Sequence, residues 1–147
     1  MNISYWRNVD FATLEHIAPV KKPLTGWSDK LYQEAYLVNS IGNLTLLPEK
    51  ENSSIGNSSW EKKRLFYKAV SAESKEQLNI AKAAAKKSGV DFGKKTIAAL
   101  EKGNCLPIVK AISNTNDWTN DIIKQRTENI AKLCWFELSG WIELESE

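Results

Sequence analysis

The spacing of proline and glycine changes after residue 58, and this change constrains the fold more than any other feature. Six prolines and glycines fall within residues 19–56, so the first part of the chain has room only for short elements. Apolar runs at 13–17 and 44–47 predict two short strands. From Ser59 onward, apolar residues recur at helical spacing. The pattern therefore predicts an α+β protein with a strand pair followed by a mainly helical part.

Three helices are expected in the second part. The first begins after Ser58 or Ser59, either of which suits an N-cap, and its buried face is formed by apolar residues at helical spacing. These residues are Trp60, Leu65, Phe66 and Ala69. A second helix contains the alanines at 83–85, and a third follows Thr119 and contains Ile122, Ile123, Arg126, Ile130, Leu133 and Trp135. No repeat or linker interrupts the chain, so residues 1–147 are predicted to form one domain.

Length and composition exclude several classes of protein. A chain of 147 residues that is 42% hydrophobic can bury a core of its own. The single histidine and the two isolated cysteines, Cys105 and Cys134, cannot supply the four ligands of a structural zinc site. No apolar run approaches the ~18 residues of a membrane span, and the first residues do not resemble a signal peptide. A cytoplasmic protein without a membrane segment is expected.

The charge is modest overall but uneven along the chain. A net charge of +2 does not by itself indicate nucleic-acid binding. Basic residues concentrate in 61–68 and 82–95, whereas the last eleven residues contain only acidic charges. Solvent-exposed helix faces are the simplest interpretation of both basic stretches. The stretch 89–96, GVDFGKKT, lacks the glycine spacing and the preceding buried strand of a phosphate-binding loop.

The sequence LEHIAP at 14–19 contains His16, the only histidine of the chain. An imidazole can accept a proton near neutral pH, as hydrolysis of a phosphodiester by water requires. The oxygens of Glu15 and Asn52 suit Mg²⁺ or Mn²⁺, which would stabilise the charge that develops on the phosphate. Neighbouring residues of a strand point to opposite faces, so Glu15 and His16 share a site only at a strand end, which Pro19 favours.

In order along the chain, these motifs resemble the HNH, or ββα-metal, nucleases. EHI-x-P is followed by GNL at 42–44 and by an Asn-x4-Asn-x4-Lys pattern at Asn52, Asn57 and Lys62. This set, with the closing segment from Trp118 through Arg126, is similar to the C-terminal HNH domain of GmrSD-type restriction endonucleases over about residues 10–136. The resemblance implies a ββα-metal (His-Me finger) core at about 11–70 and a helical remainder at about 71–145.

The resemblance also implies a role for each motif residue. His16 would be the general base, and Glu15 and Asn52 would bind the divalent metal. Asn43 would hold the loop between the strands through backbone hydrogen bonds, so that His16 is correctly oriented. Lys62 and Arg126 would be cations for the phosphate or the transition state. Each residue also has a simpler interpretation: a turn for Asn43, a polar loop for Asn52 and Asn57, and solvation or local pairing for the cations. The six tryptophans are expected in the core.

The resulting hypothesis is a metal-dependent endonuclease that hydrolyses DNA, as the cutting module of a restriction or anti-phage defence system. GmrSD-type proteins carry an N-terminal NTP-binding domain, so the targeting part is expected on a separate or missing domain or subunit. One alternative is a non-catalytic module that binds nucleic acid or a partner through Lys62, Lys63 and Arg64. Another is an RNase toxin that uses the same residues.

Overall fold

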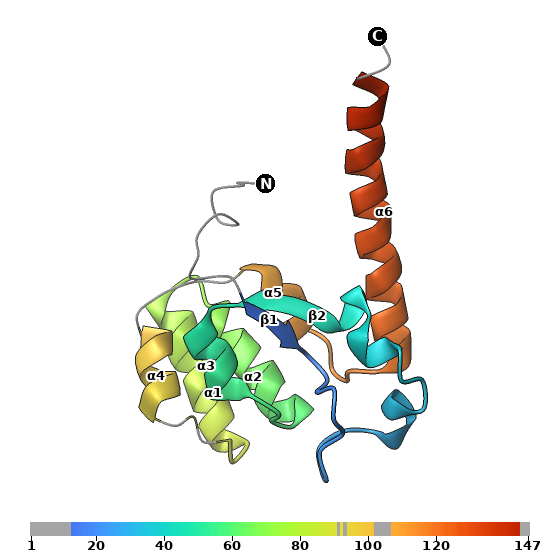
Figure 1. Cartoon of the computed structure of the whole chain (residues 1–147). Helices are drawn as coiled ribbons and strands as arrows, with labels where there is room; N and C mark the ends of the chain where they lie inside the picture. The colour runs from blue at the N-terminus through green and yellow to red at the C-terminus, as the bar shows by residue number, and fades with distance from the viewer. Residues whose placement is uncertain (1–12, 91, 93, 102–106, 145–147) are drawn as a thin grey trace.

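The predicted strand pair is present and forms a small antiparallel sheet. In the computed structural model, which describes residues 13–90, 92, 94–101 and 107–144, β1 (Thr13–His16) pairs with β2 (Leu44–Leu47). The register places Glu15 opposite Thr45 and His16 opposite Leu44. The long connection between the strands contains three short 3-10 helices: η3 (Asp29–Tyr32), η4 (Leu37–Asn39) and η5 (Ile41–Asn43). With helices around this sheet, the molecule is an α+β protein (Figure 1).

In the described part of the chain, six α-helices follow β2. They are α1 (Glu49–Ile55), α2 (Trp60–Val70), α3 (Lys75–Lys87), α4 (Lys94–Glu101), α5 (Pro107–Ser113) and α6 (Asn120–Leu144). The predicted starts of α2 and α6 are confirmed, because the Ser59 and Thr119 side chains accept hydrogen bonds from backbone amides of the first turns. Helices α1, α4 and α5 were not predicted; in α1, the asparagine and the serines favour turns over helix interiors.

Helix α2 occupies the centre of the helical part and contacts α3, α5 and α1. Its buried face contains Trp60, Phe66 and Tyr67. The Trp60 ring lies 5.3 Å from the Trp118 ring and 6.2 Å from the Trp27 ring, centroid to centroid. These three tryptophans join the start of α2, the segment before α6 and the connection between the strands, so the prediction that tryptophans form core contacts holds for them.

The outer edges of the two strands are covered by side chains. Ile17 N–H donates to Asn43 O, which continues the register and shows that alternate residues direct their backbone groups toward the partner strand. The carbonyls of Leu14, His16 and Leu44 therefore point away from the partner. Asn52 of α1, Lys63 of α2 and Arg126 of α6 donate to these three carbonyls, respectively. A two-stranded sheet is marginal alone, and here the surrounding helices complete it.

The two halves of α6 have different surroundings. The first half packs on η5, where a Cβ on Gly42 would overlap the Ile123 carbonyl oxygen and the Thr127 hydroxyl. The second half extends away from the other elements (Figure 1). Its large apolar side chains are exposed, namely Leu133, Trp135, Phe136, Leu138, Trp141 and Ile142. Trp135 and Trp141 thus depart from the predicted core position. Within the described ranges, no helix combines the length and the apolar character that a membrane crossing requires.

Candidate functional site

His16 is the last residue of β1, and its side chain is half-buried. Alternation along the strand places it on the same face as the exposed Leu14 and opposite the buried Glu15. Among the described residues, no hydrogen bond engages its imidazole, whereas its backbone is held on both sides. Its carbonyl accepts from Lys63 Nζ at 2.8 Å, and the next amide, Ile17 N–H, donates to Asn43 O at 2.9 Å. The main chain is fixed and the ring remains accessible.

Glu15 lies in a buried ion pair beneath the strand. Its Oε1 is 2.5 Å from Lys63 Nζ and accepts a second hydrogen bond from the Tyr67 hydroxyl at 3.1 Å. Glu15 is 5% exposed and Lys63 is 1% exposed. In the part of the chain that the structure describes, both bonds go to Oε1 and none goes to Oε2.

The expected arrangement of Glu15 and His16 at one strand end is not what the structure has. The strand continues through Glu15 to His16, so the two side chains leave on opposite faces. Lys63 nevertheless brings them into one unit, because its ammonium contacts both the Glu15 carboxylate and the His16 carbonyl at the outer edge of β1. The Glu15 carboxylate therefore lies close to that edge.

Burial controls the ionisation of this cluster. It raises the pKa of the Glu15 carboxyl, an effect that the Lys63 ammonium opposes. It likewise lowers the pKa of the Lys63 ammonium, against the attraction of Glu15. The pKa of Tyr67 is raised well above its usual value by burial and then by Glu15, so its hydroxyl is a donor. Each charge of the pair thus depends on the other for compensation.

Asn52 reaches the same edge of β1 from α1. Its Nδ2 donates to Leu14 O at 3.1 Å and to Thr13 Oγ1 at 3.0 Å. Its side-chain oxygen makes no hydrogen bond with another described residue. Because Leu14 and His16 flank Glu15, Asn52 and Lys63 lie on either side of Glu15 along this edge. Asn57, by contrast, is an exposed residue beyond the end of α1.

Asn43 makes the loop contacts that the hypothesis required. It is fully buried, and its Oδ1 accepts from Ala18 N–H and Trp118 Nε1, each at 2.9 Å. Its Nδ2 donates to Ala18 O and Val38 O, each at 2.8 Å. A carboxamide with two bonds at each end is fully used. Asn43 therefore ties the residues after His16 to the end of the connection between the strands.

The two candidate cations have different surroundings. Arg126 Nη1 donates to Gly42 O at 2.5 Å and to Leu44 O at 2.7 Å, and burial lowers the pKa of its guanidinium. These contacts fix the start of β2 and account for Arg126 without a phosphate. Lys62 is half-buried in the first turn of α2, and its ammonium has no hydrogen-bond partner among the described residues. Its neighbour Lys63 is buried. The alternative binding surface of Lys62, Lys63 and Arg64 therefore does not include an exposed Lys63.

The donor atoms at the β1 edge fit a hard cation that keeps several waters. Carboxylate and carboxamide oxygens are the ligand types that Mg²⁺ and Mn²⁺ accept, and Glu15 Oε2 and Asn52 Oδ1 are of these types. The described residues contain no cluster of three or more histidines, cysteines, aspartates or glutamates. A site with one carboxylate and one amide would not form such a cluster. In the same region, the buried Thr45 hydroxyl, opposite Glu15 in the register, has no partner among the described residues.

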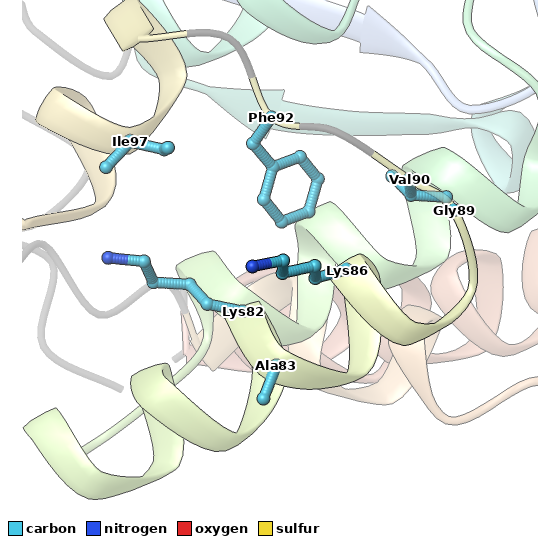
Figure 2. A pocket seen from close by; sticks show the side chains of 7 residues that line it. All are labelled: Lys82, Ala83, Lys86, Gly89, Val90, Phe92 and Ile97. Atoms are coloured by element: carbon cyan, nitrogen blue, oxygen red, sulfur yellow. The ribbon is translucent and has the colours of Figure 1, made fainter.

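A separate pocket lies between α3 and α4 and has a volume of about 570 Å³. Figure 2 shows Lys82 and Lys86 extending beneath Phe92 and Ile97. The Lys82 ammonium is paired with Glu101 at 2.8 Å. The described lining contains no histidine, acid or amide side chain; it consists of Lys82, Ala83, Lys86, Gly89, Val90, Phe92 and Ile97. The described lining therefore offers neither an imidazole nor a side-chain oxygen ligand for a cation, whereas the β1 edge offers both.

Sequence reasoning missed Lys63 and Tyr67, the two partners of Glu15. Lys63 stands in a run of three basic residues, and charge alone does not distinguish it from its neighbours. Helix phase would have done so: Trp60, Lys63, Tyr67 and Val70 follow the three- and four-residue spacing of one helix face, and all four are buried. A lysine on an apolar face indicates a buried partner.

Comparisons with known proteins identify one family. The family described as GmrSD restriction endonucleases, C-terminal domain, matches residues 2–133, which is most of the chain. The match includes both strands, the residues at the β1 edge and the first half of α6. The search of curated proteins finds no match.

Proposed function

Because this chain belongs to the family of GmrSD restriction endonuclease C-terminal domains, we propose that it is a divalent-metal-dependent endonuclease that hydrolyses DNA phosphodiester bonds. One observation carries the proposal: the strand that ends in the only histidine has a carboxylate and an asparagine at its outer edge. The order of elements, strand, strand and then the helix that carries Asn52, is the order of a ββα-metal core.

In this proposal, His16 takes the proton from the attacking water. Its ring has no hydrogen-bond partner among the described residues, while its main chain is fixed on both sides. A general base needs this combination of a free acceptor nitrogen and a defined position. Asn43 would contribute by fixing Ile17 and Ala18, and it would act through His16 without touching the substrate.

Glu15 Oε2 and Asn52 Oδ1 are the proposed ligands of Mg²⁺ or Mn²⁺. The bound cation would stabilise the negative charge that develops on the phosphate and on the leaving oxygen. The protein's own contribution is to present these oxygens at a fixed edge, with Glu15 Oε1 and Asn52 Nδ2 already held by other groups. Lys62 remains a candidate phosphate contact, and Arg126 is assigned to positioning of the β2 loop.

DNA is the proposed substrate, and the cutting module would work with a separate NTP-binding targeting domain or subunit. An RNase of the same fold would use the same residues, since phosphate and metal are common to both substrates. Cleavage assays with supercoiled DNA and with a structured RNA, run in parallel, distinguish a DNase from an RNase.

The test is cleavage of supercoiled plasmid with Mg²⁺ or Mn²⁺, with EDTA as the metal-free control. His16→Ala should reduce the rate on the order of 10²- to 10⁴-fold. Asn52→Ala should also reduce the rate, whereas Asn79→Ala, at an exposed asparagine of α3, should not. Retention of most activity by His16→Ala would refute the assignment of the base. Cleavage that persists in EDTA would refute the metal requirement.

A further inference from the structure

Lys63 makes two contacts from one buried ammonium. Its Nζ lies 2.5 Å from Glu15 Oε1 and 2.8 Å from His16 O, and the residue is 1% exposed. These contacts join the side chain of one proposed site residue to the main chain of the next. The second bond also supplies an acceptor to a further N–H of the buried ammonium.

The stability of an ion pair does not by itself account for a lysine at this position. Removing two charges from water is costly, and well-packed apolar residues often replace such a pair without loss of stability. A defined geometry at Glu15 and His16 is a function that such a buried charge can serve.

The contacts leave particular atoms free. Tyr67 and Lys63 both hold Glu15 Oε1, and since a carboxylate is planar, fixing one oxygen restricts the other. Lys63 also holds the carbonyl of His16, so the imidazole can move only by its own side-chain rotations. Among the described residues, Glu15 Oε2 and the His16 ring are left without hydrogen-bond partners, and these are the groups that the proposed reaction uses.

We propose that Lys63 is a positioning residue that sets the Glu15 carboxylate toward the divalent cation and the His16 ring toward the attacked phosphate. This inference rests on the proposed function. Lys63 touches neither the substrate nor the reacting atoms. It acts through Glu15 and His16, with Tyr67 as its second support.

The decisive variant is Lys63→Arg, which keeps the positive charge but replaces a compact ammonium by a planar fork. Lys63→Met removes both contacts and the positive charge, and its thermal unfolding shows how much the charge contributes to stability. Tyr67→Phe removes only the second bond to Oε1. Lys68→Met, at an exposed position of the same helix, is the matched control. Thermal unfolding identifies the variants that remain folded, and the comparison is made among these.

Two measurements do not depend on cleavage. Mn²⁺ binding, followed by the electron paramagnetic resonance signal of the free ion, should weaken about 10- to 100-fold in Lys63→Arg, as is typical when a group that orients a metal ligand is changed. The only histidine gives a single set of ring signals in proton–carbon NMR, so the orientation of His16 can be observed directly. These signals should shift in Lys63→Arg and stay in place in Lys68→Met.

The outcomes separate this inference from the proposed function. If the wild-type chain binds Mn²⁺ but cuts no DNA or RNA, the nuclease proposal fails, and Lys63 is judged by Mn²⁺ affinity and the His16 signals. If folded Lys63→Arg binds Mn²⁺ as the wild type does and keeps the His16 signals, positioning by Lys63 is overturned. If the wild-type chain binds no Mn²⁺, both are overturned.

Discussion

The strand pair and the far half of α6 depart from the usual distribution of residues in opposite ways. At the strands, a charged pair and a carboxamide are buried, and each finds partners within the described chain. Along the second half of α6, six large apolar side chains face solvent. Burial of polar groups that find partners within the chain indicates a position defined by this chain. Exposure of apolar groups all around a helix indicates a segment whose environment the described chain does not provide.

The largest effect on the free energy of unfolding is expected at Asn43. If its buried amide proved dispensable, the strand region would not depend on its buried polar groups, and the contrast with α6 would fail. Asn43→Ala leaves four buried groups without partners, on Ala18, Val38 and Trp118. The free energy of unfolding should fall on the order of 4 kcal/mol, since each stranded group costs ~1–3 kcal/mol. Urea denaturation measures this loss. Asn39→Ala, at an exposed asparagine in the same connection, should change little; equal losses would contradict the assignment.

Gly42 lies in the loop that α6 contacts, and Gly140 lies in the second half of α6. Replacement by alanine should lower the free energy of unfolding at Gly42 and raise it at Gly140, which sharpens the comparison. Gly42→Ala places a methyl group against the backbone of α6 and should cost about 1–3 kcal/mol. Gly140→Ala, where a Cβ meets nothing within 4 Å, should stabilise the helix by ~0.5–1 kcal/mol. Thermal unfolding of both variants tests this, and a gain in Gly42→Ala would show that the loop and helix are not in close contact.

A smaller effect is expected at Glu34, which links the connection between the strands to the first half of α6. Hydrogen bonds from Lys124, Tyr36 and Asn120 hold the pKa of Glu34 at about 2. A lowered pKa means that the contribution is present above the ordinary value of 4.5 and is lost as the pH falls toward about 2. Glu34→Gln should flatten the pH dependence of stability in this window, as urea midpoints at several pH values would show.

Its control is Glu76→Gln, at an exposed glutamate of α3, which should leave the pH dependence in place. An unchanged slope in Glu34→Gln would mean that the contact between Glu34 and Lys124 does not persist in solution.

The smallest effect on stability is expected for the exposed tryptophans. Trp135→Ser combined with Trp141→Ser should change the free energy of unfolding by no more than ~0.5 kcal/mol, because these side chains are 70% and 65% exposed. Trp118→Phe, at a buried tryptophan, should cost about 1 kcal/mol through loss of the bond to Asn43. Calorimetry distinguishes the two cases. A large loss in the double variant would show that the far half of α6 is covered in solution.

Local signals in the sequence predicted the strands and the starts of α2 and α6. Ser59 and Thr119 cap their helices through contacts a few residues away, which a sequence pattern contains. Helix α1 depends on packing against β1 and α4, so its turn-favouring composition was misleading. Local propensity is a weak guide where distant elements decide the outcome.

The motif located the candidate site but not its internal contacts. His16, Asn43 and Asn52 were singled out by order and spacing, and the structure gathers them at β1. That Glu15 pairs with Lys63, and that Arg126 binds carbonyls at the start of β2, depends on residues 48 and 82 positions apart. Such contacts arise from the arrangement of helices around the sheet. Helix phase in the neighbouring sequence indicates that Lys63 is buried, but it does not identify the residue that Lys63 pairs with.

Helix α6 is attached to the body only near its first half in the described structure, and this attachment lies next to the loop that follows His16. A helix of 25 residues is about 37 Å long, and its contacts with the body lie near one end, at the turn formed by Gly42 and Asn43. The helix is therefore an extended arm attached to the body near that turn. Asn43, in the turn, binds Ile17 and Ala18, directly after His16. A load on the far half of α6 would reach the loop that holds His16 through this attachment.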